Sequence, residues 1–351
     1  MKKPIIALLL MCAGFSAFAQ DTTAVPEVAV PEVKDTAYWH TGTTLAINLA
    51  QTSLTNWNAG GQNSIAYNAL SNSFVNYEKE KLVYSNSLTM SFGQANLADK
   101  GWRKTDDRLY YLSKLSHKKS DKLRYTMYLD FLTQFADGYN YVASNANPGR
   151  DSAVLVSKFL SRGYSIFALG AEYTPVDGMF IFFSPLTMKS TIVAYQPFAN
   201  AGNFGVRPEY IDGNGNRHAG SNFLFEPGAL IDALYKKDVH KNISLQTKVD
   251  LFWAYARKHY TIDKITGELK NDSYVLNKNI DVMWDFSLVA KVTKYITASL
   301  TTSLIYDDDI KVLRSKYAND QTNPKAYGPA IQFKQVLGLG IQAMFKSKYT
   351  N

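Results

Sequence analysis

Long runs of alternating apolar and polar residues constrain this chain more than any other feature. In the run 243–255, almost every second residue from Ile243 to Tyr255 is apolar, and the runs 280–292 and 123–135 repeat the pattern. A period of two predicts β-strands with one apolar and one polar face. These runs exceed ten residues, whereas strands of soluble proteins average about 5–6 and a tilted strand crossing a bilayer needs about 9–11. The pattern therefore predicts membrane-spanning strands.

Reading the whole chain in this way predicts about twelve strands. The predicted spans are 43–53, 62–77, 82–93, 106–117, 122–136, 159–174, 179–195, 222–236, 241–257, 275–292, 295–306 and 327–345. Three of them have a weaker pattern. The span 106–117 alternates poorly, 179–195 is apolar on both faces and contains Pro185, and 222–236 contains Pro227. Because proline cannot donate a ladder hydrogen bond, Pro185 predicts a bulge or bend in its strand.

The connections between these strands differ in length in an ordered way. Short links fall at 78–81, 118–121, 175–178, 237–240 and 293–294, all on one side if the strands run up and down. Long links fall on the other side, at 137–158, 196–221, 258–274 and 307–326, and the links 54–61 and 94–105 are intermediate. Outer-membrane barrels have this asymmetry. An open sheet edge is not viable in hydrocarbon, where each unpaired backbone group costs several kcal/mol. We therefore predict an all-β fold, a closed, antiparallel, up-and-down transmembrane barrel.

The N-terminal region predicts export. Lys2 and Lys3 precede an apolar run at 5–11 and a small-residue cleavage pattern at 17–19, which together are typical of a signal peptide. We expect residues 1–19 to be a cleaved signal peptide, 20–38 a flexible periplasmic leader rich in Pro and acidic residues, and 39–351 the barrel. The single cysteine, Cys12, would be lost with the signal, which leaves no disulfide or thiolate site. The expected location is the outer membrane of a Gram-negative cell.

The polar faces of the strands supply the first candidate site. Seven charged residues should line the lumen: Arg124, Asp130, Glu172, Lys248, Asp250, Asp281 and Asp285. Five are acidic and two are basic, so an open lumen should mildly prefer cations. The same charges can instead pair and close the interior. Twelve strands lie between the roughly eight of a filled barrel and the roughly sixteen of a channel, so both readings stay open.

The loops supply the second candidate site. Asn56, Trp57 and Asn58 precede Gly60 and Gly61, and this hairpin is either a tight turn with an interfacial anchor or a binding site in which Trp57 stacks on a sugar ring. At the end of another strand, the run Asp307, Asp308 and Asp309 is either a solvated charge run or a site for a divalent cation that bridges lipopolysaccharide. No metal or cofactor is predicted.

Several segments together resemble a known family. They are NLAQTSLTNWNAGGQNS at 48–64, the charged run 104–108, LDFLTQFADGY at 129–139, and the strings 184–187 and 203–206. They are similar to an uncharacterised family of outer-membrane β-barrel proteins from Bacteroidetes, described as a domain of unknown function. The likeness extends over nearly all of the chain after the signal, and the NW-x-x-GG hairpin is its most specific part. The resemblance implies a barrel in the outer membrane and no established activity.

No catalytic motif accompanies the barrel pattern. The five histidines are scattered without metal-ligand spacing, and neither a P-loop, a G-x-S-x-G elbow nor an H-E-x-x-H motif is present. We therefore expect a protein that is not an enzyme. The leading hypothesis is a pore or transport-type protein for small solutes. The alternatives are a non-conducting structural or assembly partner of other envelope proteins and an outer-membrane hydrolase. Outer-membrane lipid is the expected surrounding, and nucleic acid is not an expected partner.

Overall fold

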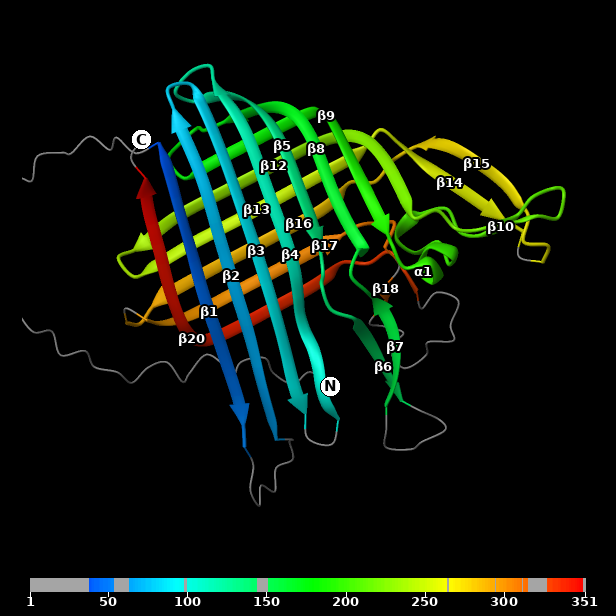
Figure 1. Cartoon of the computed structure of the whole chain (residues 1–351), viewed down its shortest axis with the longest axis horizontal. Coiled ribbons are helices and arrows are strands. Elements are labelled where there is room, and N and C mark those ends of the chain that lie inside the picture. Colours follow the sequence, from blue (N-terminus) through cyan, green and yellow to red (C-terminus); the bar gives the residue numbers. More distant parts are fainter. Residues whose placement is uncertain are drawn as a thin grey trace, which may run out of the picture. The chain divides into compact units, whose positions relative to one another are not determined.

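Twelve antiparallel strands form a closed barrel in the computed structural model (Figure 1). The structure describes residues 38–53, 63–97, 100–143, 151–263, 265–293, 295–310, 312–314 and 327–349. In order around the wall, the barrel strands are β1 (Trp39–Thr52), β2 (Ser64–Lys79), β3 (Leu82–Leu97), β4 (Gly101–Lys118), β5 (Leu123–Thr133), β8 (Ser161–Tyr173), β9 (Met179–Val193), β12 (Phe223–His240), β13 (Ile243–Ala254), β16 (Asp281–Lys291), β17 (Ile296–Tyr306) and β20 (Gln332–Tyr349). This arrangement confirms the predicted fold, including the three spans with a weaker pattern.

The short and long connections fall at opposite rims, as predicted. Each long connection carries small elements of its own, which the strand pattern did not predict. They are β6 (Gly138–Ala143), β7 (Asp151–Ser157), α1 (Gln196–Asn200), η1 (Asn203–Gly205), β10 (Tyr210–Ile211), β11 (Arg217–His218), β14 (Ala256–Ile262), β15 (Leu269–Leu276), β18 (Val312–Leu313) and β19 (Tyr327–Gly328). We call the rim that carries these elements the loop end. Within the described ranges, no helix is long and apolar enough to cross a membrane.

The segment 94–105 is not the loop that the sequence predicted. β3 and β4 remain paired there, from Gln94 opposite Lys104 to Leu97 opposite Gly101. The register shifts at Gly93, so a bulge interrupts the ladder at the point where the apolar alternation ends. Because both faces of the hairpin beyond the bulge carry polar residues, its sequence has no strand period to detect.

Strand β9 contains the bulge that Pro185 predicted. Its register against β8 shifts between Leu169 and Ala171, and its register against β12 shifts between Gly228 and Leu230. Before the bulge Phe182 and Ser184 are buried, and after it Thr187 and Lys189 are buried instead. The bulge therefore moves the inward face from even to odd residues. This switch explains why the segment seems apolar on both faces.

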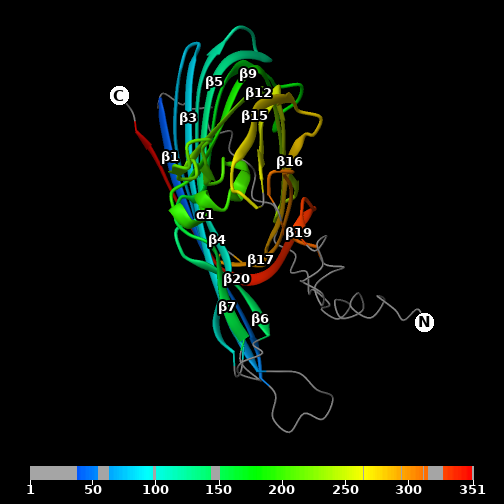
Figure 2. The same cartoon turned by 90° about the vertical axis from the view of Figure 1, so that its right-hand side faces the viewer.

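Strand β20 closes the wall by dividing its length between two partners. Residues 332–341 pair with β17, and residues 340–349 pair with β1. The change of partner falls at Gly340 and Ile341, which pair with both strands. A Cβ atom on Gly340 would lie 2.2 Å from the carbonyl oxygen of Ile47, so only glycine permits this close approach. Figure 2 shows β1, β3 and β5 along one side of the wall and β16 and β17 along the other.

The outer face of the wall is apolar and exposed. Leu337 is 78% exposed and Leu186 is 68% exposed, and each has apolar neighbours on the same face two residues away. A water-soluble protein rarely exposes so continuous an apolar surface. The packed core lies inside the barrel. It consists of Tyr128, Ala168, Phe182, Leu230, Phe252 and Ala254, with Leu112 and Ile166 beside it.

Candidate functional site

The polar faces of the strands point into the barrel, as contacts between strands that are not neighbours demonstrate. Arg108 on β4 donates to Asp285 on β16 through both terminal nitrogens, each 3.2 Å from Oδ2. The Nζ atom of Lys189 on β9 lies 2.5 Å from the carboxylate of Asp281 on β16. Because β4 and β9 are not adjacent to β16 in the wall, these contacts can be made only through the interior.

Lys248 is the centre of one buried charge group. Its Nζ atom donates to Asp250 at 2.8 Å, lies 3.2 Å from Asp232, and also contacts the hydroxyl of Tyr110 at 3.3 Å. Tyr110 belongs to β4 and Lys248 to β13, so this group also crosses the barrel. Two carboxylates and one ammonium leave a formal excess of one negative charge inside the wall.

The remaining predicted lumen residues also have partners inside the barrel. Glu172 lies 3.1 Å from Lys114 and 3.6 Å from Arg124. Asp130 accepts hydrogen bonds from the hydroxyl of Tyr128 at 2.9 Å and from the backbone amide of Ile166 at 3.0 Å. All seven residues proposed from the sequence thus lie on the inner face, and each contacts a cation, a carboxylate or a hydrogen-bond donor.

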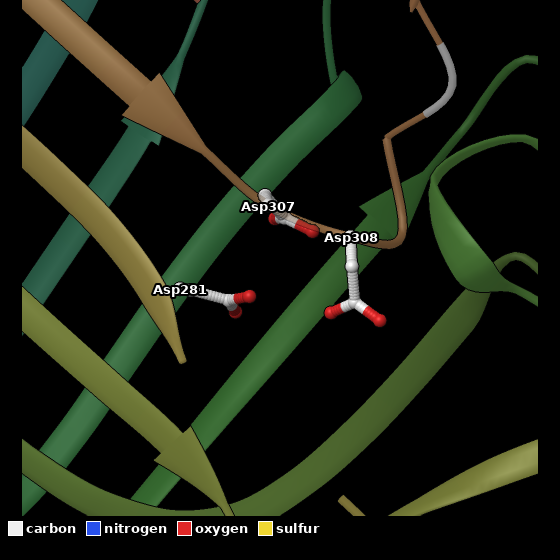
Figure 3. Close-up of side chains that lie close together, drawn as sticks. All are labelled: Asp281, Asp307 and Asp308. Atoms are coloured by element: carbon white, nitrogen blue, oxygen red, sulfur yellow. The ribbon is translucent and has the colours of Figure 1, made fainter. Parts of the chain in front are cut away.

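A second charge group lies in the interior near the loop end. Lys189 contacts Asp281, Asp307 at 3.3 Å and Glu226 at 3.8 Å. Figure 3 shows Asp281 on β16 and Asp307 and Asp308 just beyond β17, with their carboxylates turned toward the same space. Their oxygens lie within 4.8 Å of one another, a spacing compatible with a metal ion. Lys189 already supplies positive charge to two of them, so the charge of this acidic group is balanced in part without a metal ion.

Of the two interpretations of the run 307–309, the solvated charge run is wrong, because the chain turns inward there. Asp307 is buried, and Arg257 forms ion pairs with both Asp308 and Asp309. Asn279 donates a further hydrogen bond to Asp308 at 2.8 Å. Burial raises the pKa of Asp309 to about 6, and the negative charge of Asp307 adds to this effect while Lys189 and Arg257 oppose it.

The inward charges that the sequence pattern missed include Arg108, Lys114, Lys189, Glu226 and Asp232. Arg108 and Lys114 lie on β4. There the apolar Leu112 points inward and the polar Ser113 outward, which reverses the usual barrel pattern and makes the strand difficult to read from sequence. The bulge in β9 hides Lys189. Glu226 and Asp232 share one face of β12. Their inward position could have been predicted, because residues six positions apart lie on the same face of a strand.

One side of the interior is less filled than the other. The apolar core occupies the side formed by β5, β8, β9, β12 and β13. The side formed by β1–β3 has small polar residues, such as Asn72 and Thr89, which share a 2.7 Å hydrogen bond. Leu70 lies on the same face as Asn72 and is still 36% exposed. An inward side chain keeps that exposure only where solvent can enter, so this side offers space for small polar molecules.

A cavity of about 310 Å³ opens from the interior at the loop end. Its walls come from β4, β5 and β8 on one side and from β16, β17 and β20 on the other, so it spans the barrel. The polar lining includes Arg108, Thr133, Arg162, Tyr164, Ser303 and Gln332. The cavity was not among the sites predicted from the sequence, because its lining residues come from six segments far apart in the chain.

The hairpin residues Asn56, Trp57 and Asn58 lie outside the described residues, so their binding role stays a prediction. The predicted signal peptide and leader also lie outside them.

The closed wall, the apolar outer face and the polar interior together define a membrane-spanning β-barrel. A family model described as a protein of unknown function, DUF3078, matches residues 49–139. That span includes the NW-x-x-GG hairpin and covers a smaller part of the chain than the resemblance seen in the sequence. No curated protein is similar enough in sequence to match the chain.

Three solved structures illustrate the similarity to other barrels. An outer membrane channel from Pseudomonas putida F1 has 10% identity and a TM-score of 0.36, with 93% of this chain and 100% of that chain covered. The translocator domain of the autotransporter NalP from Neisseria meningitidis has 10% identity and a TM-score of 0.30, with 90% of each chain covered. The Pseudomonas putida toluene transporter TodX has 9% identity and a TM-score of 0.31, with 88% of each chain covered. The barrel assignment itself rests on the strand pairing described above.

Proposed function

We propose that this protein is an outer-membrane barrel that admits small polar solutes through a narrow, selective interior. The observation that carries the proposal is the 310 Å³ cavity at the loop end, which leads toward an interior filled on one side only. Solutes would pass along the small polar side chains of β1–β3, beside the apolar core. The exposed apolar face would contact outer-membrane lipid, and the predicted signal peptide would bring the chain to that membrane.

The charges of the interior should also set an ion preference. Eight acidic residues and five basic residues of the two charge groups and their neighbours face inward: Asp130, Glu172, Glu226, Asp232, Asp250, Asp281, Asp285 and Asp307, with Arg108, Lys114, Arg124, Lys189 and Lys248. Because acidic residues are in excess, the proposed passage should mildly prefer cations.

Single-channel recording in planar bilayers tests the proposal. The refolded barrel should give small, discrete, weakly cation-selective steps. Arg108 is the β4 lining residue farthest from the loop end, and Asp285 holds it across the interior. The double variant Arg108→Ala and Asp285→Ala shortens both side chains without changing the net charge, so it should enlarge the steps. The variant Lys258→Ala and Asp272→Ala removes an ion pair on the β14–β15 hairpin and serves as the matched control.

A second function is favoured by the packed core. Tyr128 and Phe182 stack within the barrel at a centroid distance of 5.4 Å, and a filled interior suits a non-conducting partner in an envelope complex. Silence from both the folded wild type and the Arg108→Ala, Asp285→Ala variant would contradict the pore and favour this role. Co-purification in mild detergent then tests it, and a protein that always purifies alone as a monomer would count against it.

A further inference from the structure

The acidic residues that line the loop-end cavity are fully occupied by donors from the protein. Asp106 accepts hydrogen bonds from Lys334 at 2.7 Å and from Asn68 at 2.9 Å. Asp107 accepts one from Lys104 at 2.7 Å and two from the backbone amides of residues 135 and 136, each at 2.9 Å. Neither carboxylate is therefore free to bind a cation that enters the cavity.

The basic residues are not matched in the same way. Lys334 is paired with Asp106, and Arg108 is paired with Asp285, which also accepts a hydrogen bond from Ser303 at 2.6 Å. Arg162, the second residue of β8, lines the cavity, and its guanidinium group forms no hydrogen bond or ion pair with the described residues. Once the internal pairs are counted, the cavity has one spare positive charge.

The other unused polar atoms in the lining are also donors. The hydroxyl of Tyr164, the amide nitrogen of Gln332 and Nε of Arg108 are each buried without a hydrogen-bond partner. Buried polar groups are normally satisfied, so several unsatisfied donors around one cavity indicate a missing acceptor. Tyr164 lies two residues from Arg162 on β8 and both line the cavity, so a single bound group can contact both.

Apolar side chains complete the cavity. Leu132, Met283 and Ile305 also belong to the lining. An inorganic anion would leave these side chains without a partner, whereas an organic acid can bury its carbon chain against them. Only one positive charge is spare, so a second negative charge on the ligand would be buried without compensation.

We propose that the loop-end cavity binds a small organic monocarboxylate, with its carboxylate on Arg162, Tyr164 and Gln332 and its carbon chain against Leu132, Met283 and Ile305. This inference deepens the proposed function and rests on it, because it names the class of solute that the barrel receives at its outer mouth. The acidic excess of the interior, which includes the group around Lys189 near the loop end, opposes onward movement of an anion. The bound acid should therefore remain at the mouth and reduce the cation current.

The test uses the folded full-length barrel in detergent and three four-carbon probes: butyrate, butyramide and butylamine. Ligand-detected NMR titration measures binding directly, without any need for conduction. Butyrate should bind about tenfold or more tightly than butyramide, because charge-assisted hydrogen bonds are about twice as strong as neutral ones and the spare charge has no partner in butyramide. Butylamine should not bind measurably.

The variant Arg162→Gln should remove the preference for butyrate over butyramide, and Arg162→Lys should restore part of it. Tyr164→Phe should weaken butyrate binding by about threefold, as expected for one neutral hydrogen bond. Arg217→Gln is the matched control. Arg217 is an exposed arginine on β11 that already pairs with Glu209, so its loss should leave butyrate binding unchanged.

Equal binding of butyrate and butyramide by the wild type would overturn the proposal. Unchanged butyrate binding in a folded Arg162→Gln variant would also overturn it, and if that variant does not fold, unchanged binding in Tyr164→Phe together with Gln332→Met decides the matter in the same way. Butyrate binding by a barrel that does not conduct would contradict the pore and leave the site intact. Conduction without butyrate binding would contradict the carboxylate site and leave the proposed pore intact.

Discussion

At the scale of single residues, buried charges dominate the interior of this barrel. Lys248 serves two carboxylates and a phenol at once, and Lys189 contacts three carboxylates. Removing one member of such a group leaves its partners charged and buried, which costs more than the group contributes when intact. The interior therefore depends on two lysines, of which the strand pattern predicted Lys248 to face the lumen but missed Lys189.

Replacing Lys248 with methionine should destabilise the folded barrel by about 3–5 kcal/mol, because Asp232 and Asp250 would then be buried without a counter-charge. Urea unfolding in lipid vesicles, followed by tryptophan fluorescence, measures the change. Lys258→Met breaks a surface ion pair with Asp272 on the β14–β15 hairpin and should cost at most about 1 kcal/mol. Equal losses in the two variants would show that the Lys248 group contributes no more than a surface pair.

The carboxyl group of Asp309 should titrate near pH 6 in the folded protein, above its usual pKa of 3.8. Between about pH 4 and pH 6, the folded state then binds more protons than the unfolded state. The contribution of this group to stability therefore falls as the pH rises through that range. A carboxyl-carbon NMR titration gives the midpoint. Arg257→Gln should raise it further, because Arg257 stabilises the ionised form. A midpoint near 4 would contradict the burial of this side chain.

At the scale of the element, alternation located most of the twelve barrel strands and indicated the others weakly, because the lipid-facing residues must be apolar at every second position. It failed where the ladder is irregular. The bulge beside Pro185 reverses the two faces of β9, and the polar extension of β3 and β4 has no apolar face at all. A bulge depends on how neighbouring strands pair, so its effect on Lys189 could not be obtained from one segment of sequence.

The β9 bulge requires a glycine on the neighbouring strand. A Cβ atom on Gly170 of β8 would lie 2.1 Å from the carbonyl oxygen of Phe183, which is part of the backbone and cannot rotate away. Gly170→Ala should therefore destabilise the barrel by about 1–3 kcal/mol. Gly213→Ala is the control, because nothing lies within 4 Å of a Cβ atom there. Unfolding curves for the two variants in vesicles compare them, and a neutral Gly170→Ala would refute the described register.

At the scale of the whole molecule, strand number, direction and the division into short and long connections could all be predicted, since a closed wall in lipid admits few alternatives. The arrangement of side chains inside the barrel could not be predicted. The seven predicted lumen residues do face inward, but some of their partners come from strands far apart in sequence, as Arg108 does for Asp285 and Lys189 for Asp281. The loop-end cavity likewise combines Arg162 with Gln332, and no local pattern relates these two residues.

The membrane placement predicts a depth-dependent response to charge on the outer face. Leu337 lies opposite Leu300 near the middle of the β17–β20 ladder and is 78% exposed. Leu337→Arg should cost about 2–4 kcal/mol in vesicles if this position faces the bilayer midplane. Ile265→Arg, at the tip of the β14–β15 hairpin where Ile265 is 95% exposed, should be nearly neutral. Urea unfolding distinguishes them, and a neutral Leu337→Arg would argue against a lipid-facing wall.

The division of β20 between two partners also has a mechanical consequence. Ten residue pairs join β20 to β1, the same number as join β20 to β17 and β16 to β17, so the position of the seam and not its pair number sets it apart. The first of these pairs, Trp39 with Tyr349, lies at the rim where β1 begins and β20 ends. A force that pulls those two ends apart would load the pairs one after another instead of all together. The wall should therefore yield to a small force applied at this seam, although heat or denaturant must disrupt the whole barrel at once.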